Sequence, residues 1–160
     1  MFRTVKTVSI VMILIGFASA FGAVMTFMQL PSRITEFFTS LSDNKYVILM
    51  YLNVMLLLIG TLMDMAPIIL ILTPVLLPVT NSLGIDPVHF GMIMMVNLGI
   101  GLITPPVGSV LFVASAVSKQ KIEVVVRAML PFYAVLLVVL AMVTYIPAVS
   151  LWLPHMLGMN

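Results

Sequence analysis

Five long stretches of the chain carry no charged side chain, and they constrain its fold more than any other feature. They are 26, 18, 21, 32 and 33 residues long and cover residues 7–32, 46–63, 65–85, 87–118 and 128–160. An α-helix needs about 20 apolar residues to cross the hydrocarbon of a bilayer. Most of these stretches are therefore long enough to span a membrane, and the charges gather in the segments between them.

The composition leads to the same fold class. Hydrophobic residues make up 62% of the chain and charged residues 8%, with a mean hydropathy of +1.28. A soluble domain carries about a quarter charged residues because its surface faces water. We therefore expect an all-α integral membrane protein that lies in the lipid bilayer and binds no nucleic acid. The chain has no cysteine, and its two histidines are isolated, so we expect neither a thiol site nor a histidine metal site.

The first two elements are a span and an interfacial helix. Residues 8–28 form an apolar stretch that is too long for a signal peptide and lacks a convincing cleavage site, so we predict a retained span. Residues 31–42 place four apolar residues on one helical face: Ile34, Phe37, Phe38 and Leu41. This pattern predicts an amphipathic arm helix that lies in the membrane interface.

Residues 46–84 consist of two short apolar arms that meet at Asp64, with Pro67 just beyond it. An ionised Asp at the bilayer centre costs roughly 2.5–3.5 kcal/mol, so Asp64 requires protein, water or a cation around it. The tip between the arms has this one charge and no Lys or Arg. That favours a re-entrant helical hairpin in which Asp64 can cap the second arm. Two full spans are the alternative.

Residues 88–118 are too long for one straight span, and helix breakers interrupt them in the sequence NLGIGLITPPVG at 97–108. Since Pro106 has no N–H and Pro105 disfavours helical geometry in the residue before it, we predict that the helix stops near Ile103 and restarts near Pro106. Irregular backbone at this depth is tolerated only where it is buried in protein or lines a cavity. A broken helix with a binding site is favoured over a kinked packing helix.

The remaining segments set the orientation. Residues 119–127 carry three cations and one Glu, so this loop is net positive and is predicted to be cytoplasmic. The N-terminal end with Arg3 and Lys6 is also net positive and is predicted to lie on the same side. Residues 128–148 then form the last of about three spans, and Trp152 follows it as an interfacial aromatic.

Electrostatics gives the break a function. We expect the carbonyls at 99–103 to have no helical partners, so they and the Thr104 hydroxyl suit a cation. The amides from Val107 onward suit a carboxylate, because the two half-helices present opposite dipole ends. Asn97 adds a neutral amide, and Asp64 adds a negative charge from the hairpin tip. The predicted substrate-binding residues are Asn97, Pro106, Val107 and Gly108.

Residues 60–115, with the motifs GIDPVHFG and GLITPPVG, resemble the C-terminal half of the large membrane subunit of TRAP transporters. The later segments VVVRAMLPF and YIPAVSLWLP resemble that family's ending. The resemblance implies half of an inverted-repeat, elevator-type permease in the bacterial inner membrane. Such permeases import C4-dicarboxylates, sialic acids or related organic acids with Na⁺ as the coupling ion. They work with a small membrane subunit and a periplasmic solute-binding protein.

The resemblance also implies a Na⁺ site between the hairpin tip and the helix break. It places Gly60, Thr61 and Asp64 opposite Ile103, Thr104 and Pro105. Together with the argument from the half-helices, this predicts one set of cation-binding residues: Gly60, Thr61, Asp64, Gly99, Gly101, Ile103, Thr104 and Pro105. We expect no other cofactor.

The chain departs from the family in length. The family's large subunit has two inverted halves and is more than twice as long, so we expect this chain to be a fragment, natural or truncated, whose partners include the missing N-terminal half. An enzyme is not expected, since Asp64 is the only acid inside an apolar block and no Ser/His pair lies at depth. The alternative is a structural membrane subunit without its own binding site. The sequence identifies neither the acid carried nor the oligomeric state.

Overall fold

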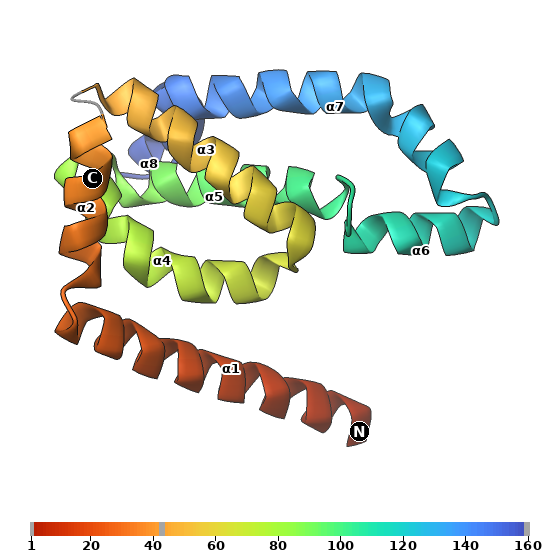
Figure 1. Ribbon diagram of the computed structural model, residues 1–160, viewed down its shortest axis with the longest axis horizontal. Helices are drawn as coiled ribbons and strands as arrows, with labels where there is room; N and C mark the ends of the chain where they lie inside the picture. The colour runs from red at the N-terminus through yellow and green to blue at the C-terminus, as the bar shows by residue number, and fades with distance from the viewer. Residues whose placement is uncertain (1, 42–43, 159–160) are drawn as a thin grey trace.

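The structure, a computed structural model, describes residues 2–41 and 44–158, and this part of the chain is built of helices without strands (Figure 1). The helices are α1 Phe2–Phe27, α2 Leu30–Leu41, α3 Lys45–Leu62, α4 Met65–Ser82, α5 Pro87–Leu102, α6 Ser109–Ser118, α7 Ile122–Tyr145 and α8 Pro147–Met156. Within the described residues, α1, α3, α4 and α7 are long and apolar enough to cross a membrane. The predicted all-α membrane fold class is confirmed.

Helices α3, α4 and α5 form the centre of the molecule (Figure 1). Helices α3 and α5 run in the same direction and pack closely. Helix α4 runs in the opposite direction and leads from the end of α3 back to the start of α5. Their contact surfaces carry the largest buried apolar side chains, which are Ile48, Leu52 and Leu56 of α3, Ile68 and Val79 of α4, and Phe90, Ile93 and Leu98 of α5. The two arms of the hairpin thus pack mainly through α5, rather than on each other.

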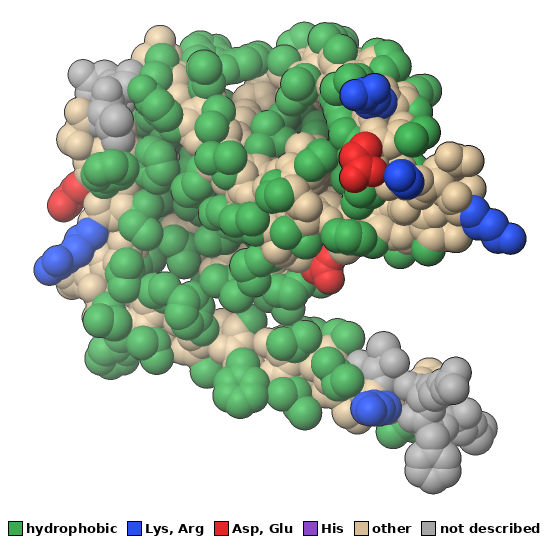
Figure 2. Space-filling model, turned by 45° about the vertical axis from the view of Figure 1, so that its right-hand side comes forward, with side chains coloured by type: hydrophobic (Ala, Val, Ile, Leu, Met, Phe, Trp, Pro, Cys, Tyr) green, Lys and Arg blue, Asp and Glu red, His purple; other side chains and the backbone are tan. Residues whose placement is uncertain are grey.

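Helices α1 and α7 lie at opposite margins of this centre (Figure 1). In the most apolar 18-residue stretch of each, only 6% of the residues are buried. Apolar side chains cover most of the face shown in Figure 2, and only a few charged side chains interrupt them. An apolar surface of this extent is unsuited to water. It suits contact with lipid or with another membrane-embedded chain.

Several helix ends differ from the predicted ones. Helix α7 starts at Ile122, inside the predicted loop 119–127, because Lys121 is extended and Glu123 suits the positive end of a helix. It ends at Tyr145 rather than 148, since Pro147 cannot continue the helix and disfavours helical geometry at Ile146. A short helix, α8, follows that the sequence argument did not predict. The predicted last residue of the arm helix, Ser42, lies outside the described residues.

Candidate functional site

The end of the hairpin arm α3 contacts the break between α5 and α6 backbone to backbone. A Cβ atom added to Gly101 would lie 2.6 Å from the carbonyl carbon of Gly60. Beyond this point, the Gly108 amide donates to the Thr61 carbonyl at 3.3 Å. Only glycine at position 101 permits the approach, and the structure therefore brings Gly60 and Thr61 against the predicted helix break.

A cavity of about 130 Å³ lies between the hairpin tip and the start of α6. Its lining residues are Gly60, Thr61, Leu62, Met63, Asp64, Val107, Gly108 and Ser109. Asp64 occupies the N-cap position of α4 with extended backbone, but its side chain makes no capping hydrogen bond. The predicted capping role is therefore wrong in the structure. The carboxylate instead contributes the one formal charge among the residues that line this cavity.

The last turn of α5 tightens before the break. The amides of Ile103 and Thr104 donate to the carbonyls of Ile100 at 3.2 Å and Gly101 at 3.0 Å. The Thr104 hydroxyl also donates to the Ile100 carbonyl, at 2.7 Å. These carbonyls were expected to lack partners, and that expectation is wrong for both. The Ile100 carbonyl thus accepts two hydrogen bonds, which use both of its lone pairs. The Gly101 carbonyl accepts one from the Thr104 amide and keeps a lone pair for a second ligand.

Helix α6 begins three residues later than predicted. The peptide bond between Pro105 and Pro106 is cis, and both residues are exposed. Gly108 forms the N-cap with a φ of +35°, and a Cβ there would lie 2.9 Å from the Thr104 carbonyl oxygen. A residue with a side chain would be strained at this position. The first helical residue is therefore Ser109, whose turn directs its amides toward the side of the break where Val107 and Gly108 line the cavity.

Asn97 lies elsewhere. It is fully buried, and its Nδ2 donates to the carbonyl oxygen of Asn53 at 3.1 Å and to its Oδ1 at 2.6 Å. Asn53 in turn donates to the Thr144 hydroxyl at 3.0 Å, and the His89 ring Nε2 is 3.3 Å from the Thr144 carbonyl oxygen. This buried polar chain joins α5, α3 and α7. Of the predicted site residues, Gly60, Thr61, Asp64, Val107 and Gly108 line the cavity at the hairpin tip. The others do not line it: Asn97, Gly99, Gly101, Ile103, Thr104, Pro105 and Pro106.

One residue that contacts the break was not predicted from the sequence. Tyr133 of α7 donates from its hydroxyl to the Ile103 carbonyl at 2.6 Å, across 30 residues of sequence. The available signal was a hydroxyl in an otherwise apolar run, which does not reveal its acceptor.

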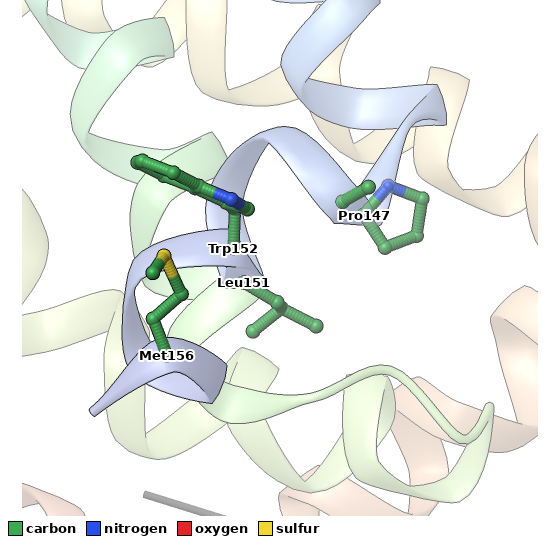
Figure 3. Close-up of a pocket in the computed structure, with 5 residues that line it drawn as sticks. Pro147, Leu151, Trp152 and Met156 are labelled. Carbon is green, nitrogen blue, oxygen red and sulfur yellow. The ribbon is translucent and has the colours of Figure 1, made fainter. Parts of the chain in front are cut away.

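A larger hollow near the end of the chain has a different character. It measures about 500 Å³ and is lined by Pro147, Ala148, Leu151, Trp152 and Met156, four of which are labelled in Figure 3. The indole N–H is the only polar side-chain group among them, so this hollow does not suit a charged ligand. Among the described residues there is also no cluster of three or more His, Asp or Glu side chains that could hold a metal ion.

Comparison with known proteins covers nearly the whole chain. Residues 1–149 match the family model described as the tripartite ATP-independent periplasmic transporter, DctM component. The chain is 47% identical to the C4-dicarboxylate TRAP transporter large permease protein DctM of Pseudomonas aeruginosa, over 97% of this chain and 36% of that protein. It is 38% identical to the sialic acid TRAP transporter large permease protein SiaM of Vibrio cholerae, over 96% and 36%.

An uncharacterized protein of Salmonella typhimurium, YgiK, is 50% identical over 94% of this chain and 35% of its own length. The chain thus spans about a third of the length of these relatives.

Proposed function

Because the chain belongs to the DctM family of TRAP transporter large permeases, we propose that it supplies one Na⁺ site and part of the substrate cavity of a Na⁺-coupled importer of organic acids. The family consists of transporter permeases and not of enzymes. The observation that carries the proposal is the contact between hairpin tip and helix break, with Asp64 lining the cavity between them.

The oxygen atoms at this contact support a cation site. Asp64 brings a formal negative charge, and the end of α5 brings the negative pole of a helix. Backbone carbonyls of the hairpin tip and the hydroxyl of Thr104 are hard oxygen ligands of the kind that can replace the water shell of a cation. In the proposed site the cation neutralises Asp64, which is costly to hold as a bare anion within a membrane.

The start of α6 supports an anion site beside it. The Gly108 amide already donates to Thr61 and the Leu111 amide to Gly108. The amides left for an anion are therefore those of Ser109 and Val110, at the positive pole of the helix. Val107 and the N-cap residue Gly108 precede the first turn of α6, and Ser109 is its first helical residue. A carboxylate or a sulfonate is a matching ligand. Relatives are named for C4-dicarboxylate, sialic acid and isethionate, and we propose an acid of this general kind.

The remaining parts of the proposal concern the assembly. We place the chain in a bacterial inner membrane, beside an N-terminal half, a small TRAP membrane subunit and a periplasmic solute-binding protein. Helices α3 and α4 would form the re-entrant hairpin, and α2 the interfacial arm of an elevator-type half. Each hairpin arm has 18 residues, or about 27 Å at 1.5 Å per residue. A cysteine at Met65 that resists impermeant reagents from both sides would support the hairpin over two full spans.

Na⁺-dependent uptake tests the site itself, in proteoliposomes that hold the complete permease, its small subunit and the binding protein. Asp64→Asn removes the charge at constant size, and Thr104→Val removes the hydroxyl at constant shape. Both should weaken the Na⁺ dependence more than the substrate affinity at saturating Na⁺. Ser109→Leu should weaken substrate affinity more, because it obstructs the amides of α6. An unchanged Na⁺ dependence in Asp64→Asn and Thr104→Val would instead favour a structural subunit without its own site.

A further inference from the structure

Tyr133 is the one residue of α7 whose side chain hydrogen-bonds to the helix break. Its hydroxyl donates to the Ile103 carbonyl at 2.6 Å, and the residue is partly buried on a helix whose surface is otherwise mostly exposed. Ile103 is the C-cap of α5, the point where the chain leaves the helix. This contact therefore fixes the peptide group that joins the helix to Thr104.

The carbonyl of Ile103 needs such a donor. The chain turns away after residue 103, so no amide of a further helical turn reaches this oxygen. An unpaired carbonyl in a membrane costs free energy, and it would rotate toward any donor within reach. The tyrosine hydroxyl occupies one lone pair and leaves the other for a second ligand. The hydrogen bond thus holds the carbonyl in one direction without using its full capacity.

We propose that Tyr133 is a positioning residue of the cation site, which holds the Ile103 carbonyl and the adjoining Thr104 in the orientation that Na⁺ binding requires. This inference rests on the proposed function and assigns α7 a part in it. Tyr133 is 30 positions away from Ile103 in the sequence. Like Ile103 and Thr104, it does not line the cavity beside Asp64, so it would act on the cation site through the backbone that leads from Thr104 to Val107 and Gly108.

In a purely structural role, Tyr133 would only hold α7 in place, but other contacts in the structure already do this. The other end of α7 is already tied to the centre by the bond from Asn53 to Thr144 and by the approach of His89 to the Thr144 carbonyl. Helix α7 also packs against α5, α6 and α8. Loss of one hydroxyl should therefore leave α7 in place and disturb the break locally.

Tyr133→Phe tests this, since it keeps the ring and removes only the hydroxyl. In the proteoliposome assay, the Na⁺ concentration for half-maximal uptake should rise roughly three- to tenfold, as expected for the loss of one hydrogen bond. The substrate KM at saturating Na⁺ and the thermal stability in detergent should stay within about twofold and about 2 °C of the parent, since the ring still packs. Tyr51→Phe is the control, because Tyr51 is 48% exposed on α3 and its hydroxyl makes no hydrogen bond to the break.

The outcomes separate the two proposals. Uptake by the parent that does not depend on Na⁺ removes the proposed function, and this inference with it. A shift in Asp64→Asn without a shift in Tyr133→Phe leaves the proposed function standing and overturns the role of Tyr133. Equal losses in Na⁺ and substrate affinity overturn it too. So does failure of Tyr133→Phe to accumulate where Thr144→Val accumulates, because Tyr133 would then hold the helix rather than the cation site.

Discussion

Helices α1 and α3 are both apolar enough to span a membrane, yet their polar side chains find hydrogen-bond partners in different places. In α1, the hydroxyls of Ser19 and Thr26 donate to carbonyls of their own helix, four residues back. In α3, the Asn53 side chain bonds to two other helices, through Asn97 and Thr144. The share of buried residues follows, at 6% for the most apolar stretch of α1 and 33% for that of α3.

The difference shows which small and polar residues in such a chain indicate contact with another helix. A hydroxyl can satisfy itself on its own helix and remain in contact with lipid. A carboxamide has two donors and an acceptor, and it needs partners from elsewhere. Glycines divide in the same way, since a Cβ on Gly16 of α1 would meet nothing within 4 Å, whereas one on Gly101 would collide with Gly60 of α3. Hydropathy alone does not separate the two helices.

The largest expected effect comes from filling the closest approach. Gly101→Ala should destabilise the protein by about 1–3 kcal/mol, because the added methyl meets backbone that cannot move aside cheaply. Gly16→Ala and Gly99→Ala should be neutral or slightly stabilising, since both positions are open and alanine favours a helix. Thermal unfolding in detergent measures all three. A Gly101→Ala variant as stable as the other two would break the comparison between the helices.

A smaller loss is expected from the buried polar chain. Asn97→Ala leaves Asn53 without one of its partners and should cost about 1–2 kcal/mol. Ser19→Ala in α1 removes only a bond within the helix and should change the unfolding temperature little. If both substitutions cost the same, then burial of the Asn97 carboxamide of α5 against Asn53 of α3 contributes no more to stability than a bond within one helix. A double-mutant cycle of Asn53→Ala with Thr144→Val would measure the next link of the chain.

The smallest effect is expected where α1 contacts α4. A Cβ on Gly22 would lie 3.2 Å from the Cβ of Pro74, so the neighbour has to give by a few tenths of an ångström. Gly22→Ala should therefore change stability by less than about 0.5 kcal/mol. The same unfolding measurement detects it. A loss as large as that of Gly101→Ala would show that α1 is held as tightly as α3 and would remove the distinction drawn between them.

The sequence predicted the parts of the site that depend on local chemistry. The prolines and glycines around Thr104 predict a broken helix. Asp64, as the one charge between two apolar arms, predicts a hairpin tip that needs protein, water or a cation around it. Partners that come from distant segments were beyond it. A polar residue in an apolar helix can face a ligand or another helix. The sequence predicted a substrate contact for Asn97 and did not predict that its Nδ2 donates to Asn53.

The same limit applies to Tyr133, whose acceptor lies 30 residues away. It also applies to Gly101, because the need for a glycine there is set by the backbone of another helix. The end of α7 is a different case. Pro147 was a visible local signal for a helix end, and the predicted span ran past it to residue 148.

The central claim is that a cation binds between Asp64 and the helix break, and alkylation of single cysteines tests it without requiring transport. Residues 1–160 contain no cysteine, and any cysteine in the rest of the permease is replaced before the test. Ser109→Cys places a thiol on the cavity wall, and Val117→Cys places one on the same helix at a position that is 79% exposed. In the complete permease, Na⁺ should slow alkylation at position 109 relative to K⁺ at equal ionic strength. It should leave position 117 unaffected, and Asp64→Asn should abolish the protection. Equal rates in Na⁺ and K⁺ at position 109, or equal slowing at both positions, would contradict the claim.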